Sequence, residues 1–193
     1  MLDKALEILR DELTAYLKRL PDLNITSETV VFLSNIVDDA GTVVIPDNAL
    51  ALTLVNIEEE RILKSQESTS QGASGRVSYR NPEIKLNLYL LFTGNFQTYE
   101  TGLKYLGGVV RFFQAKNVFL PENTPDMDPS LEKLVLEMHN LNFEQQNHLW
   151  GALGAKYLPS VLYELRLITI QEDATSMEEA PIKQVHFADR GMN

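Results

Sequence analysis

The strongest constraint on the fold is a stretch of strict alternation between Pro82 and Gly94. Apolar residues occupy every second position there, which predicts an extended segment with one face buried in a sheet. Pro82 has no backbone N–H to donate and suits the start of a strand, and Gly94 with Asn95 is typical of a turn. Leu91 is apolar as well, so a helix or another subunit is expected to cover the second face near the strand end. The apolar face of this strand, residues 83–93, consists of Ile84, Leu86, Leu88, Leu90 and Phe92.

Composition and charge exclude several classes of function. The 193 residues carry a formal net charge of -10, the pI is near 4.8, and the 17 Lys and Arg residues are dispersed. Nucleic acid is therefore not an expected partner, because phosphate binding depends on clustered basic residues. Cysteine is absent, which excludes disulfides and thiolate metal sites. No apolar run approaches about 18 residues, and acidic residues interrupt the N-terminal pattern, so neither membrane insertion nor a secretory signal is expected.

Residues 2–20 form the first predicted helix, which ends before Pro21. Apolar residues recur at steps of three and four, with charged residues on the other side. About three heptads without continuation favour a helix packed on its own sheet over a coiled coil. The stripe consists of Leu2, Ala5, Leu6, Leu9, Leu13, Leu17 and Leu20.

A second helix is predicted over residues 95–115. One stripe of large apolar residues runs along it, namely Tyr99, Leu103, Leu106, Val110 and Phe113, and Val109 and Phe112 widen it. Gly102, Gly107 and Gly108 lie inside the helix, where each costs about 1 kcal/mol relative to alanine. We interpret them as a close approach of this helix to the sheet, with a kink at the adjacent pair as an alternative.

Further strands complete an α+β fold with a mixed, mainly antiparallel sheet and about three packed helices. Residues 130–141 fit a helix or a strand equally well by periodicity. Asn142 with Gln145 predicts a capping box that opens a third helix, and Gly154 ends it. Asp38 and Asp39 begin a predicted turn. The other strand candidates are residues 29–35, residues 50–63 with a bulge or a change of burial, the short segment 116–120, and residues 161–167.

Two polar segments lie outside this core. Residues 64–75 are small and polar, and with residues 76–79 they predict a β-hairpin that projects from the body. Residues 171–193 lose the period and are predicted to be an extended tail, which leaves residues 1–170 as the domain. Such segments can order onto a sheet edge of a neighbour. The candidate partner-binding residues are Lys64, Gln66, Glu67, Gln71, Arg76, Tyr79, Arg80, Val185, His186 and Phe187.

No combination of residues predicts a catalytic or metal site. Glu144 and His148 lie four apart on the third helix without a third ligand, which favours a surface pair. His139 beside Glu137 fits a catalytic general base with its orienting carboxylate. A histidine that is exposed, or whose hydrogen bonds are satisfied within the fold, is nevertheless favoured. Trp150 is interpreted as a core or interface anchor. We therefore expect no cofactor, no metal and no enzymatic activity.

A set of segments in fixed order carries a resemblance to a known family. These segments are residues 82–93, Tyr99, residues 112–114, residues 140–143, residues 149–151 and residues 157–163. Together they resemble the tube-cap, or tail-terminator, family of contractile injection systems, phage-tail-like particles that drive a rigid tube through a target envelope. The similarity covers about residues 1–170 and is densest from residue 77 onward.

The resemblance implies a homo-hexameric ring on the last ring of the inner tube, which ends tube growth and contacts the terminal sheath ring. It also favours a strand for residues 134–141. A ring that matches the tube end on one face only would stop heterologous stacking, and this needs shape without chemistry. Such a protein is expected to assemble in the bacterial cytoplasm, in a particle that is either released or anchored at the envelope.

Two other functions stay open from the sequence. One is a tube or baseplate adaptor of the same particle. The other is a small-ligand-binding or enzymatic α+β domain that uses a pocket beside Trp150 and His148. A terminator forms a ring or binds tube ends, so the mass in solution separates it from an enzyme.

Overall fold

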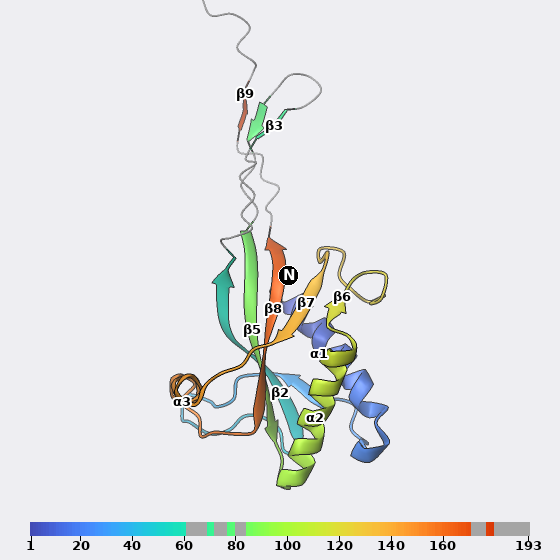
Figure 1. Ribbon diagram of the computed structural model, residues 1–193, viewed down its shortest axis with the longest axis vertical. Coiled ribbons are helices and arrows are strands. Elements are labelled where there is room, and N and C mark those ends of the chain that lie inside the picture. The colour runs from blue at the N-terminus through green and yellow to red at the C-terminus, as the bar shows by residue number, and fades with distance from the viewer. Residues whose placement is uncertain (61–68, 72–76, 80–83, 171–176, 180–193) are drawn as a thin grey trace, which may run out of the picture.

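The computed structural model describes residues 1–60, 69–71, 77–79, 84–170 and 177–179. Within them, three α-helices pack on a six-stranded sheet of order β1-β2-β5-β8-β7-β6 (Figure 1). β1 is parallel to β2 and the other neighbouring strands are antiparallel, so the predicted mixed, mainly antiparallel α+β fold is confirmed. None of the helices in the described ranges is long and apolar enough to cross a membrane.

The bounds of the elements agree with most of the predicted segments. In chain order they are α1 (Leu2–Lys18), a 3-10 helix (Pro21–Leu23), β1 (Val31–Leu33), β2 (Ala49–Glu59), β3 (Thr69–Gln71), β4 (Val77–Tyr79), β5 (Ile84–Asn95), α2 (Tyr99–Ala115), β6 (Val118–Phe119), β7 (Leu134–Met138), α3 (Phe143–Ala152), β8 (Ser160–Ile170) and β9 (Met177–Glu179). Residues 134–138 therefore form a strand, as the resemblance favoured.

The alternating stretch is the central strand β5, which pairs with β2 on one side and β8 on the other. The predicted turn at Gly94 and Asn95 is wrong. Both residues stay in the ladder because β2 supplies partners for them, Leu50 and Ala49. The chain leaves the sheet only after Asn95, so α2 begins at Tyr99 rather than at residue 95. The bulge predicted in β2 is confirmed between Leu54 and Asn56.

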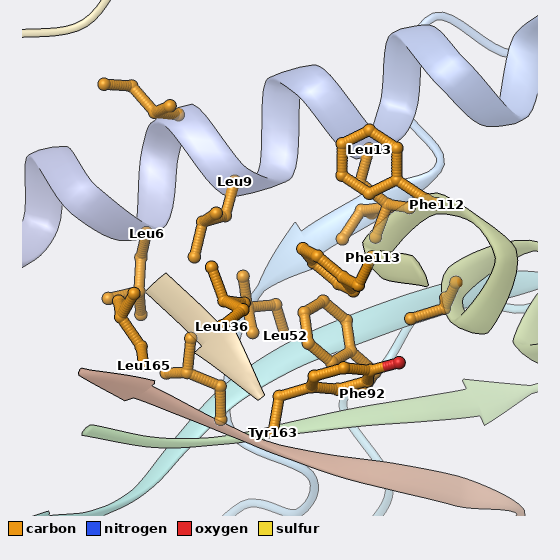
Figure 2. Packing of buried hydrophobic residues seen from close by; sticks show 14 of the residues in the cluster. Leu6, Leu9, Leu13, Leu52, Phe92, Phe112, Phe113, Leu136, Tyr163 and Leu165 are labelled. Atoms are coloured by element: carbon orange, nitrogen blue, oxygen red, sulfur yellow. The ribbon is translucent and has the colours of Figure 1, made fainter. Parts of the chain in front are cut away.

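The main core lies between one face of the sheet and the helices α1 and α2 (Figure 2). The leucine stripe of α1 is buried there from Ala5 to Leu17 as predicted, and Leu2 and Leu20 are partly buried against the same core. The aromatic residues of the core pack in a cluster, in which the ring of Phe113 lies 5.3 Å from Phe92 and 4.8 Å from Tyr163. Burial of these large side chains is the dominant stabilising contribution to a fold of this kind.

α2 buries only part of the face that was predicted for it, namely Leu106, Val109, Phe112 and Phe113. Its buried residues are Gly102, Tyr105, Leu106, Gly108, Val109, Phe112 and Phe113. Of the predicted stripe, only Leu106 and Phe113 are buried, whereas Tyr99 and Leu103 are exposed. The apolar surface of α2 is therefore wider than the part of it that packs against the rest of the chain.

The predicted approach of the α2 glycines to the sheet is also wrong. A Cβ on Gly108 would lie 2.5 Å from Leu17 Cδ2 and 3.3 Å from Leu20 Cδ1, so this glycine lets α2 approach α1 instead. A Cβ on Gly107 would meet nothing within 4 Å. The helix continues from Tyr99 to Ala115 through both glycines.

A second, smaller core covers the other face of the sheet. It contains Ile36, Ile45, Ala51, Leu91, Trp150 and Leu162, so α3 covers the second face of β5 at Leu91, as predicted. The capping box of α3 is confirmed, since the Asn142 side chain accepts from Gln145 N at 2.8 Å and the Gln145 side chain accepts from Asn142 N at 3.0 Å. Gly154 follows the helix with a φ of +66°.

β3, β4 and β9 form a separate three-stranded sheet. β3 pairs antiparallel with β4, and β4 pairs antiparallel with β9. Most of the predicted hairpin and tail lies outside the described residues, so the projection of the hairpin, the extended tail and the domain boundary at residue 170 remain predictions.

Candidate functional site

Polar residues from four strands lie in one row on the sheet face opposite α1 and α2. The ladder aligns Asn56 of β2, Tyr89 of β5, Glu164 of β8 and Glu137 of β7. Tyr89 Oη donates to Glu58 Oε2 at 3.1 Å. Burial, together with this hydrogen bond, raises the pKa of Tyr89 to about 12. The phenol therefore stays protonated at neutral pH and acts as a fixed donor.

Arg166 neutralises two carboxylates of this row. Its Nε lies 3.2 Å from Glu164 Oε1, and its Nη1 lies 3.3 Å from Glu137 Oε2. His139 Nδ1 lies 3.9 Å from Glu164 Oε2, and its ring meets Tyr89 edge-on with the centroids 5.0 Å apart. His139 is thus a half-buried histidine at the sheet surface, and its carboxylate neighbour is Glu164 rather than Glu137. The row forms a structural network.

The pocket considered beside Trp150 is small and differs from the expected one. It measures about 180 Å³ and is lined by His139 rather than His148. Trp150 is buried in the second core, with its ring 5.4 Å from that of Tyr157. Ligand pockets usually occupy about 300–1,000 Å³, so this volume does not favour the ligand-binding alternative.

A wider cleft of about 710 Å³ lies between α1 and residues 124–129, and the charged residues that line it are mainly acidic. Glu12 Oε2 is paired with Lys116 Nζ at 2.9 Å, and Asp128 accepts hydrogen bonds from Ser130. The part of the chain that the structure describes holds no group of three or more His, Asp and Glu residues arranged for a metal ion. Glu144 and His148 are both exposed on α3.

The predicted partner-binding residues fall mostly beyond the described ranges. Gln71 lies in β3, where it pairs with Val77, and Tyr79 lies in β4, where it pairs with Thr69. The other eight candidates, Lys64, Gln66, Glu67, Arg76, Arg80, Val185, His186 and Phe187, lie outside the described residues.

An exposed apolar flank on α2 is the most distinctive surface of the described core. Tyr99 is 68% exposed and Leu103 is 46% exposed, on the side of α2 that carries the predicted stripe. Toward the C-terminal end of α2, a groove of about 410 Å³ separates this helix from β7. We call it the α2–β7 groove; its apolar lining consists of Val110, Phe113, Leu136, Met138 and Tyr163.

A second exposed apolar surface follows β1. Val43 and Val44 are each 42% exposed and lie just after a tight turn. In that turn Asp38 Oδ1 accepts from Ala40 N and Thr42 N, and Gly41 has a φ of +80°, which confirms the predicted turn. Sequence analysis missed these valines, although the β-branched run at residues 42–45 is typical of a strand. We call residues 42–44 the 42–44 segment.

Comparison with known proteins gives one family and two similar structures. The family model described as "Pvc16 N-terminal domain" matches residues 4–184. The fold is similar to the sheath/tube terminator of an extracellular contractile injection system (PVC), with a TM-score of 0.61 and 12% identity. It is also similar to the tube-terminating cap of the anti-feeding prophage, with a TM-score of 0.59 and 17% identity. No curated protein gives a significant match.

These similarities cover nearly the whole chain but not the whole of the similar proteins. The first alignment covers 100% of this chain and 64% of the terminator, and the second covers 97% of this chain and 61% of the cap. The chain therefore spans less than two thirds of the length of each. The resemblance to tail terminators that the ordered segments indicated is confirmed by these matches.

Proposed function

Because this chain belongs to the Pvc16 N-terminal domain family, we propose that it is the structural cap of a contractile injection system. Six copies form a ring on the last ring of the inner tube, end tube growth and contact the terminal sheath ring. The cap acts by shape, without catalysis, cofactor, nucleic acid or membrane insertion. It assembles in the bacterial cytoplasm, in a particle that is later released or stays at the envelope.

The observation that carries this proposal is the apolar surface that the fold leaves uncovered. Tyr99 and Leu103 of α2 and Met138 of β7 are large and exposed. Large apolar side chains that the fold leaves exposed favour an interface with another protein chain. In the polar row that contains Tyr89 and Arg166, by contrast, the side chains are hydrogen-bonded or ion-paired to one another.

The proposal is tested by the length of the tubes. A tube grows by heterologous stacking, and only a layer that matches its end on one side stops the addition of further layers. Particles from cells that lack this chain should therefore carry tubes of uncontrolled length, measured by electron microscopy. Re-expression of the wild-type chain should restore one narrow length distribution. Tubes of normal length without the chain would contradict the proposal.

The hairpin segment and the tail are the proposed contacts with tube and sheath, through the candidate residues named from the sequence. Deletion of residues 65–75 should leave the domain folded and impair capping. The matched control replaces the same residues with Gly and Ser at constant length. It separates the effect of removing the native side chains from the effect of shortening the backbone. Normal tube length with the deleted chain would remove this segment from the interface.

A further inference from the structure

β7 has a backbone edge that β6 covers only in part. β6 pairs with Leu134 and Val135, and Leu136 N donates to Asn117 O at 2.8 Å on the same side. His139 N donates toward the opposite side of β7, to Leu162 O of β8, at 2.9 Å. Backbone groups alternate in direction along an antiparallel ladder. Met138 therefore directs its N–H and C=O outward, beside the α2–β7 groove.

The 42–44 segment also has an open backbone edge. Asp38 N donates to Thr42 O at 2.9 Å, and Val44 N donates to Ile36 O at 3.0 Å. By the same alternation, Val43 directs its N–H and C=O away from Val37, the residue opposite it. This segment follows β1, the first strand in the sheet order, whereas β7 lies next to the last. The 42–44 segment bridges Val37 outside the six-stranded sheet, so the two open edges belong to different parts of the fold.

The charges around the two edges are complementary. α2 carries two basic residues, Lys104 and Arg111, and one acidic residue, Glu100. Lys104 Nζ pairs with Glu100 Oε1 at 2.9 Å, while Arg111 has no carboxylate partner among the described residues and donates only to Gly107 O. Residues 34–48 contain no Lys or Arg but three acidic residues, Asp38, Asp39 and Asp47. An unpaired guanidinium thus lies on the groove helix, and unbalanced carboxylates flank the segment.

We propose that the 42–44 segment of one copy pairs with the open edge of β7 in the next copy. Backbone hydrogen bonds extend the sheet across the boundary, and valine fills the α2–β7 groove, as in β-strand addition. Arg111 faces the acidic residues beside the segment. The two surfaces differ, so the contact repeats head to tail and closes into a ring. This inference rests on the proposed function and identifies the surfaces that close the ring.

Two lysine variants test the two surfaces separately. Met138→Lys places a charge at the groove, and Val43→Lys places one on the segment. Each should weaken subunit association by about 100-fold, the order expected for a central interface residue. Both reduce the negative charge of the chain, so added repulsion does not explain a loss. Asn140→Lys is the control, because it adds the same charge at an exposed nearby position and should leave association unchanged.

Mixing the two variants tests the head-to-tail arrangement and their folding at once. The Met138→Lys chain keeps an intact segment, and the Val43→Lys chain keeps an intact groove. Sedimentation velocity should show monomers for each variant alone and a heterodimer for the equimolar mixture. Misfolded variants would give no heterodimer.

Two results would overturn this inference. Rings formed by both variants would reject these surfaces and leave the proposed cap function intact. A wild-type chain that stays monomeric, alone and with its tube protein, would reject the proposed function together with the inference.

Discussion

The adjacent glycines of α2 give a prediction that the structure makes quantitative. Gly107→Ala adds a methyl group to open space, and Gly108→Ala adds one 2.5 Å from Leu17 Cδ2, which is fully buried. Each replacement should gain about 1 kcal/mol from helix propensity. At Gly108 the overpacked contact should cost about 1–3 kcal/mol, because a close-packed core has little room to move. Gly107→Ala should therefore stabilise the chain, and Gly108→Ala should be neutral or destabilising by up to about 2 kcal/mol.

Urea unfolding followed by Trp150 fluorescence measures both changes. The helix-propensity gain is common to the two variants, so the difference between their free energies of unfolding isolates the contact with α1. We expect that difference to be about 1–3 kcal/mol, measured at a concentration where the chain is monomeric. The companion variant Leu17→Ala should relieve the clash and reduce the difference. Equal effects of the two alanines would refute the packing of Gly108 against α1.

Three further outcomes follow from the same structure. Burial raises the pKa of Tyr163 to about 12, and that of Tyr89 is raised to about 12 as well. Both values lie above the ordinary 10, so their contribution to stability is complete below pH 10 and is lost as the pH rises through 12. Phenolate absorbance near pH 10, before unfolding, that Tyr89→Phe or Tyr163→Phe removes would contradict this. Asn142→Ala removes the cap of α3 and should lower stability by about 1 kcal/mol in thermal unfolding, whereas Asn140→Ala should not. A hexamer carries 6 × -10 = -60, so sedimentation should show assembly favoured by added salt, and dissociation with rising ionic strength would oppose this.

The elements whose pattern is local were predictable from the sequence. β5 was recognised from strict alternation, α1 from its leucine stripe and α3 from its capping box. The ambiguity at residues 134–138 could not be resolved by periodicity, because both interpretations bury Leu134. The pairing with β8 that decides it comes from a segment more than twenty residues away.

The misses concern contacts between distant segments. Gly94 is a turn residue by type, yet the partner Leu50 keeps it in the ladder. The α2 stripe was identified correctly as apolar, but the sequence does not say how much of it faces a neighbouring molecule. Ile36 and Ile45 lie in a segment without period, and they are buried only because α3 folds over them. The partner-binding residues in the hairpin and tail stay predictions.

The central claim is that this chain closes into a ring that ends the tube. The most direct measurement is electron cryomicroscopy of intact particles with the chain carrying a bulky tag. The account predicts sixfold tagged density on the last tube ring, at the end away from the baseplate. Tagged density at the baseplate, or a bare particle apex with the chain monomeric in solution, would contradict it.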